Sequence, residues 1–181
     1  MTELISLIQA GIVFGTVILY GAAGEILTEK SGNLNLGVPG IMYLGGIVGL
    51  IGVFFYEMNN PAPSPILCVI IALGCAFLAS VLGGLIYSVL TISLRANQNV
   101  TGLTLTIFAG GFAIFFGGSL NKLAGGVGQI NVSTTSAAFR ATLPFVQDLP
   151  ALLRMLLGFG FMVYLAVVVA LVVSWILNRS R

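Results

Sequence analysis

Five long apolar segments constrain this chain more than any other feature of its sequence. They run over Leu4–Ala23, Leu36–Tyr56, Ile66–Leu94, Val100–Leu120 and Leu152–Leu177. A helix needs about 20 apolar residues to cross a bilayer, because each residue adds about 1.5 Å. Since 58% of the residues are hydrophobic and only 7% are charged, the chain has too few charges to cover a water-exposed surface. The sequence predicts an all-α integral membrane protein with about five transmembrane helices.

The polar links between these segments give the rest of the organisation. Pro61, Pro63 and Pro65 fall between the second and third segments and cannot continue a helix. A polar stretch rich in Gly, Ser and Thr follows the fourth segment, over 121–150, and predicts an extramembrane loop with a short interfacial helix. No shift in composition separates domains, so we expect one transmembrane domain over residues 1–181.

The composition argues against an enzyme. The chain has no histidine, which removes the usual general base, the Ser-His nucleophile pair and histidine-containing zinc sites. Cys68 and Cys75 are seven positions apart in one predicted helix, about 10 Å along its axis, which is too far for a disulfide. Glu25 and Glu29 lie near a membrane end and need not be buried. We expect no catalytic residue, metal or cofactor in this chain.

The stretch from Gly24 to Gly46 is the most informative one. Glycines and a proline alternate with asparagines at its centre, which predicts a discontinuous helix near residues 32–40. Irregular backbone at membrane depth requires surrounding protein or a water-filled cavity, and broken helices flank the substrate paths of transporters. The candidate path residues here are Asn33, Asn35, Gly37, Pro39 and Gly40. An ordinary loop in which Asn33 or Asn35 caps the next helix is also compatible with the pattern.

A second polar cluster precedes the fourth apolar segment. It supplies four further candidates for a solute path, Asn97, Gln98, Asn99 and Thr101. Uncharged amides suit hydrogen bonding to a polar, neutral ligand such as a sugar or nucleobase. The alternative is a solvated loop followed by a Thr-capped helix.

Small and aromatic residues predict helix contacts. Glycine pairs stand at 45–46, 83–84, 110–111 and 117–118, and Gly11 and Gly15 form a GxxxG spacing. The phenylalanines at 108, 112, 115 and 116 are compatible with packing or lipid contact, and also with stacking on a flat solute.

The basic residues indicate the orientation. Five spans place Lys30, Arg95, Arg179 and Arg181 on one side of the membrane, and Lys122, Arg140 and Arg154 on the other. Basic residues in short loops collect on the cytoplasmic side. We therefore expect the C-terminus in the cytoplasm and the N-terminus outside.

The stretches "EKSGNLNLGVPGIMYLGG" and "RANQNVTGL" resemble the permease subunits of bacterial ABC importers for simple sugars and nucleosides, within the branched-chain amino acid/ribose-type permease superfamily. The likeness is greatest to the nucleoside-type branch, which carries Gly-x-Leu-Asn-Leu-Gly and Arg-Ala-Asn-Gln stretches. The matching residues are Glu29, Ser31, Gly32, Leu34, Asn35, Gly37 and Gly40 in the first motif, and Arg95, Ala96, Asn97, Gln98, Thr101, Gly102 and Leu103 in the second. Many relatives have Glu where this chain has Pro39.

The resemblance implies an alternating-access permease in the bacterial cell membrane. Its expected partners are a separate ATPase subunit, a second permease subunit and a lipid-anchored or periplasmic solute-binding protein. The chain has no GxxxxGK[ST] motif, so ATP would be hydrolysed by the separate subunit. The family's cytoplasmic coupling segment and C-terminal helices would follow Arg181. The chain is therefore expected to be the N-terminal part of a permease.

Two other functions fit the sequence. A substrate-binding membrane subunit of an energy-coupling-factor importer has a similar size and would bind a vitamin tightly by itself. A non-transporting membrane scaffold would associate with neither a solute nor an ATPase.

Overall fold

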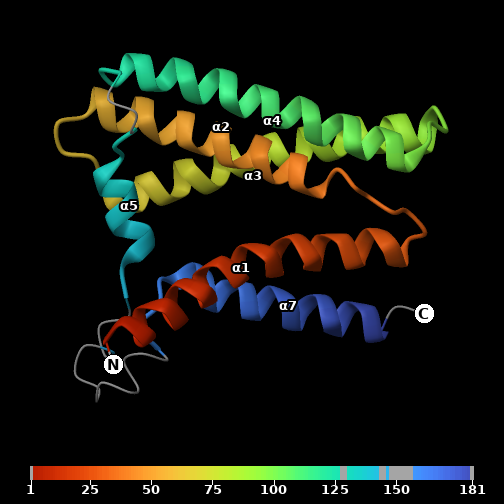
Figure 1. Cartoon of the computed structure of the whole chain (residues 1–181), viewed down its shortest axis with the longest axis horizontal. Helices are drawn as coiled ribbons and strands as arrows, with labels where there is room; N and C mark the ends of the chain where they lie inside the picture. The colour runs from red at the N-terminus through yellow and green to blue at the C-terminus, as the bar shows by residue number, and fades with distance from the viewer. Residues whose placement is uncertain (1, 127–129, 143–145, 147–156, 180–181) are drawn as a thin grey trace. The chain divides into compact units, whose positions relative to one another are not determined.

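The computed structural model describes residues 2–126, 130–142, 146 and 157–179. In chain order its helices are α1 (Thr2–Lys30), α2 (Val38–Asn59), α3 (Pro65–Ser88), the π-helix η1 (Val89–Ser93), α4 (Gln98–Leu123), α5 (Ser133–Arg140) and α7 (Phe161–Arg179) (Figure 1). Two compact units form, one from residues 31–138 and one from residues 1–30 with 139–181. The first contains α2, α3 and α4, and the second contains α1 and α7.

The prediction of five membrane-spanning helices is confirmed. The helices long and apolar enough to cross a bilayer are Ser6–Lys30, Val38–Asn59, Pro65–Ser93, Gln98–Leu123 and Phe161–Arg179. Their outward surfaces are apolar: Phe14, Ile107 and Ile114 are each at least 74% exposed. Such side chains require lipid or further protein around them. The chain is a multi-pass membrane protein.

Three boundaries differ from the sequence-based expectation. α1 continues through the polar residues after Ala23 as far as Lys30, because those residues still form helical hydrogen bonds, and the chain leaves the helix near Gly32 with φ of 87°. The expected discontinuity within a helix near 32–40 is instead a link: residues 31–37 are non-helical and join two separate spans, α1 and α2, and Pro39 and Gly40 lie in the first turn of α2. Residues 158–160 are not helical and α7 begins at Phe161. The predicted start at Leu152 lies outside the described residues.

Helices α2 and α3 pack through small residues. A Cβ atom on Gly49 would lie 2.9 Å from the carbonyl oxygen of Ala72, and one on Gly45 would lie 2.5 Å from Ser80 Oγ. Gly52 faces Cys75 in the same way. The two backbones therefore approach closely along one glycine-lined face of α2, as small residues permit in membrane helices.

Helices α2 and α4 run in the same direction. Gly37 lies near Gly102 at their beginning and Ile47 lies near Gly117 further along. Ile47, Phe54 and Leu120 then form a buried apolar cluster. α2 and α4 lie side by side over most of their length (Figure 1). Their N-terminal ends therefore meet at one end of this unit and their C-terminal ends at the other.

In the second unit, hydrogen bonds join α1 to α7. The Tyr20 hydroxyl donates to the carbonyl oxygen of Met162 at 2.9 Å. Further along, the Lys30 ammonium donates to the carbonyl oxygen of Leu177. Both contacts advance in the same sense along the two helices, so α1 and α7 are parallel.

The reversal between α3 and α4 contains a backbone outlier at Arg95. After the π-helix η1, the N–H of Ala96 donates to the carbonyl oxygen of Leu90 at 2.9 Å, and Arg95 adopts φ of 53°. This left-handed conformation is uncommon for any residue with a Cβ atom. The short reversal between α3 and α4 therefore places local strain on the backbone of Arg95.

Replacing Arg95 with glycine should raise the stability of the protein by about 1 kcal/mol, because glycine adopts positive φ without the Cβ penalty. Thermal unfolding of the detergent-purified protein measures the change. Ala96→Gly is the matched control: this exposed neighbour has negative φ, and the change should be neutral or destabilising. Equal effects of the two substitutions would show that Arg95 carries no strain.

Candidate functional site

The two polar stretches singled out in the sequence meet in the structure. The non-helical residues 31–37 lie against the first two turns of α4, within the unit formed by residues 31–138. We call residues 31–40 together with 97–106 the α2–α4 clasp. Neither of its segments contains a charged residue.

Asn35 organises the start of α2. Its side chain is 5% exposed, and its Oδ1 atom accepts the backbone N–H of Gly37 at 2.9 Å. Gly37 is the N-cap residue of α2, and no side chain caps that helix directly. Asn35 thus satisfies a donor just ahead of the helix, and Pro39 in the first turn has no N–H to satisfy.

Three side chains bind the backbone of the link. The backbone N–H of Leu34 donates to Gln98 Oε1 at 3.1 Å, and the Tyr87 hydroxyl donates to the Leu34 carbonyl oxygen at 2.9 Å. The Thr106 hydroxyl donates to the carbonyl oxygen of Leu36 at 3.0 Å. A segment without helical hydrogen bonds needs such partners where water is scarce. These hydrogen bonds hold the link against α4 and, through Tyr87, against α3.

Glycines let the two halves of the clasp touch. A Cβ atom on Gly102 would lie 2.7 Å from the backbone nitrogen of Gly37, and one on Gly40 would lie 2.7 Å from Thr106 Cα. In both pairs the opposing atom belongs to the backbone, which cannot rotate away. These contacts explain why glycine is required at Gly40 and Gly102.

The second motif caps α4. Asn97 is the N-cap residue, and its Oδ1 atom accepts the N–H of Val100 at 3.1 Å. Gln98 and Asn99 occupy the first turn, with Asn99 exposed, and Thr101 is buried. The expectation of a Thr-capped helix is therefore wrong in its residue, because asparagine accepts the cap hydrogen bond.

The nine candidate residues thus separate by environment. The buried ones are Asn35, Gly37, Gly40 and Thr101. The half-buried or exposed ones are Asn33, Pro39, Asn97, Gln98 and Asn99. Such a neutral site offers amide and hydroxyl groups to a solute. In the described part of the chain, no group of three His, Cys, Asp or Glu side chains is placed to hold a metal ion.

The sequence did not indicate two residues whose hydroxyls bind the link, Tyr87 of α3 and Thr106 of α4. A tyrosine within an apolar segment was a usable signal, because a buried hydroxyl needs a partner. Thr106 gave no such signal, because a threonine hydroxyl in a helix usually donates to a carbonyl oxygen of the preceding turn, as Thr104 does to Val100.

Comparison with known proteins adds a family to this geometry. The family model described as the branched-chain amino acid transport system / permease component matches residues 7–181. This match covers nearly the whole chain, including both halves of the clasp. The chain belongs to this permease family.

Individual relatives in the permease family carry transporter names. The guanosine ABC transporter permease protein NupQ of Bacillus subtilis is 24% identical over 169 residues, which is 93% of this chain and 50% of the relative. A putative glucose ABC transporter permease protein, TsgC13 of Haloferax volcanii, is 33% identical over 116 residues, 61% of this chain and 31% of the relative. The nucleoside ABC transporter permease protein NupC of Lactococcus lactis is 22% identical over 171 residues, 94% of this chain and 51% of the relative.

The chain spans about half the length, or less, of these permease relatives. No solved structure matches it.

Proposed function

We propose that the chain is a transmembrane permease component of an ATP-driven ABC importer for a sugar or a nucleoside. The observation that carries this proposal is the family match over residues 7–181, with relatives named as guanosine, glucose and nucleoside permeases. The uncharged clasp suits a neutral solute of that kind. Membership of the permease family also favours this function over an energy-coupling-factor subunit or a scaffold.

In this proposal the chain performs no covalent chemistry and carries no cofactor. A separate ATPase subunit hydrolyses ATP, and a second permease subunit completes the membrane pathway. A lipid-anchored or periplasmic solute-binding protein delivers the solute from outside. The protein resides in the cell membrane with its C-terminus in the cytoplasm, as the basic residues at Lys30, Arg95 and Arg179 favour.

The clasp contributes to the solute path in two ways. Asn33, Gln98 and Asn99, which are half-buried or exposed, offer polar groups to the solute, while Pro39 shapes the entrance to α2. The buried Asn35, Gly37, Gly40 and Thr101 act indirectly, by holding α2 and α4 at their close separation. Asn97 positions the first turn of α4 through its cap.

Single cysteines at Asn33 and Asn99 test this assignment. In the purified transporter, both should react quickly with a small, water-soluble methanethiosulfonate reagent in at least one nucleotide state. The control is Ile114→Cys on α4, a 79% exposed position on an apolar face, which lipid should protect because the thiolate does not form in hydrocarbon. Protection of Asn33→Cys and Asn99→Cys equal to that at Ile114→Cys, with and without ATP, would exclude both positions from an aqueous path.

A further inference from the structure

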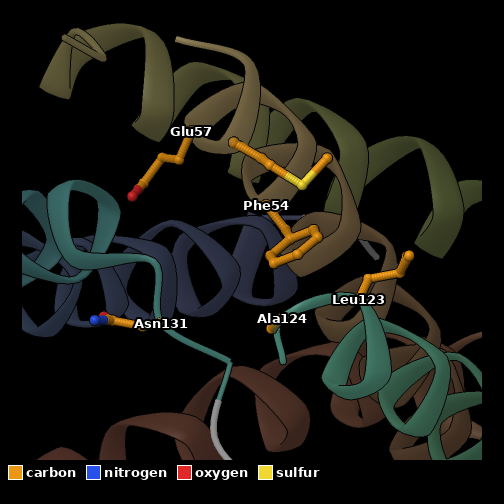
Figure 2. Close-up of a pocket in the computed structure, with 6 residues that line it drawn as sticks. Phe54, Glu57, Leu123, Ala124 and Asn131 are labelled. Atoms are coloured by element: carbon orange, nitrogen blue, oxygen red, sulfur yellow. The ribbon is translucent and has the colours of Figure 1, made fainter. Parts of the chain in front are cut away.

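A hollow of about 350 Å³ lies at the end of α2 and α4 opposite the clasp. The described residues that line it come from the C-terminal ends of both helices and from a position just before α5, namely Phe54, Glu57, Met58, Leu123, Ala124 and Asn131 (Figure 2). All six residues belong to the unit formed by residues 31–138. The volume falls in the range of small-molecule sites.

The carboxylate of Glu57 is fixed in this hollow. Its Oε1 atom accepts the backbone N–H of Thr135 at 2.7 Å and the hydroxyl of the same residue at 2.6 Å. Its Oε2 atom accepts the N–H of Thr134 at 3.3 Å. These donors belong to the N-terminal turn of α5, where the helix dipole favours a negative charge. The carboxylate is thereby held in one orientation against α5.

One oxygen of this carboxylate retains the capacity to accept a hydrogen bond. A carboxylate offers about four lone-pair directions. Among the described residues, Oε2 makes one contact at 3.3 Å, whereas Oε1 makes two short ones and a longer one with Cys68 Sγ at 3.9 Å. Figure 2 shows the Glu57 side chain extending from α2 toward α5, with the Phe54 ring directed toward Ala124 and Leu123. A ligand in the hollow would thus meet an apolar wall on one side and an acceptor on the other.

The remaining lining narrows the ligand class. Met58 and Leu123, which are 56% and 62% exposed, supply most of the apolar surface, and the exposed Asn131 amide offers both a donor and an acceptor. The described lining residues include no Lys or Arg, and among them an anionic ligand would meet the like charge of Glu57. This combination favours a flat, neutral solute that carries N–H or O–H donors.

We propose that this hollow binds a nucleoside, with its base against Met58 and Leu123 and its donors directed to Glu57 and Asn131. The inference rests on the proposed importer function, which places the C-terminal ends of α2 and α4 on the outer side of the membrane. The hollow is then an outward-facing site, separate from the clasp, where the solute binds before it crosses. Because the lining residues that the structure describes carry a carboxylate and no cation, we expect nucleosides to bind in preference to nucleotides.

Protection of a single cysteine tests the site in the intact transporter. In Met58→Cys, guanosine should slow labelling by a water-soluble thiol reagent several-fold, whereas guanosine monophosphate and glucose should slow it much less. Ala62→Cys is the matched control, because this exposed residue lies in the loop that follows α2 and does not line the hollow. Peptide-level mass spectrometry distinguishes these positions from Cys68 and Cys75.

A substitution that fills the hollow gives a second test of the site. Leu123→Trp, at a 62% exposed lining position, should abolish the guanosine protection, and Ile107→Trp, at a 76% exposed position on α4 outside the clasp, should leave it intact. The proposal is overturned if guanosine does not protect Met58→Cys, if the monophosphate protects equally, or if Leu123→Trp has no effect.

Uptake measured on the wild-type transporter shows which of the two proposals is wrong, the nucleoside site in the hollow or the importer function. ATP-dependent guanosine uptake without cysteine protection would reject the hollow and keep the importer. ATP-dependent uptake of neither guanosine nor glucose would overturn both proposals.

Discussion

Gly40→Val should destabilise the protein by about 3 kcal/mol, because the new side chain overpacks the contact between α2 and α4. A Cβ atom at Gly40 would stand 2.7 Å from Thr106 Cα and 2.9 Å from the Leu105 carbonyl oxygen, and both atoms are backbone. The helices must separate to admit it, which also breaks the hydrogen bond from Thr106 to Leu36. Thermal unfolding of the detergent-purified protein measures the loss, and transport should fall with it.

Gly46→Val is the matched control for this prediction. Gly46 lies in the same helix, and within the described structure a Cβ atom there would meet nothing within 4 Å. The propensity cost of valine in a helix is the same at both positions. If the two substitutions lower the unfolding temperature equally, the close approach at Gly40 does not hold α2 against α4.

Asn35→Ala should cost about 1–3 kcal/mol, because it leaves the buried N–H of Gly37 without its acceptor. The loss falls on the non-helical link, so hydrogen exchange at the amides of residues 34–40 should accelerate more than exchange in the middle of α3. Mass spectrometry of exchanged peptides reads both regions in one experiment.

The control for Asn35 is Asn59→Ala. Asn59 is exposed, and its side chain donates to the Phe55 carbonyl oxygen within the same helix, so its removal should change stability by less than about 0.5 kcal/mol. Unchanged exchange across the link in Asn35→Ala would mean that the Asn35–Gly37 hydrogen bond does not order the start of α2.

The transmembrane part of the fold was predictable because apolar length is a sufficient signal for it. Each of the five segments contains enough apolar residues to cross a bilayer, whatever its neighbours are. The residues at which the helices begin and end were less predictable. Helical hydrogen bonds do not stop at polar residues, so α1 runs on to Lys30. The expected interfacial helix of 121–150 corresponds in position to α5, Ser133–Arg140.

Glycine spacing predicted contacts without predicting which glycines make them. Gly45 and Gly83 lie against a neighbouring helix, while Gly46 and Gly84 face open space in the described structure. Gly11 and Gly15 likewise meet nothing there despite their GxxxG spacing. A glycine permits close helix packing only on the face that a neighbouring helix covers, and the spacing alone does not identify that face.

The aromatic stripe of α4 divides in the same manner. Phe112 and Phe116 pack against the buried cluster of Ile47, Phe54 and Leu120. Phe108 and Phe115 are 58% and 68% exposed. The packing interpretation is confirmed for the first two, and stacking on a solute stays a prediction for the others.

The sequence predicted the two motifs of the candidate site, but it did not predict that they lie next to each other. Residues 31–40 and 97–106 are far apart in sequence, and only the parallel packing of α2 and α4 brings them together. Glu57 stood in a stretch dominated by prolines and carried no local signal. Its partners, Thr134 and Thr135, lie more than 70 residues away and reach it through tertiary contacts.

Native mass spectrometry of the complex, purified from its own membranes in mild detergent, is the first test of the proposed importer function. We expect a nucleotide-binding ATPase subunit and a second permease subunit to co-purify with this chain in defined stoichiometry. A stable species that contains this chain with no ATPase, under conditions that preserve other ABC transporters from the same membranes, would contradict it.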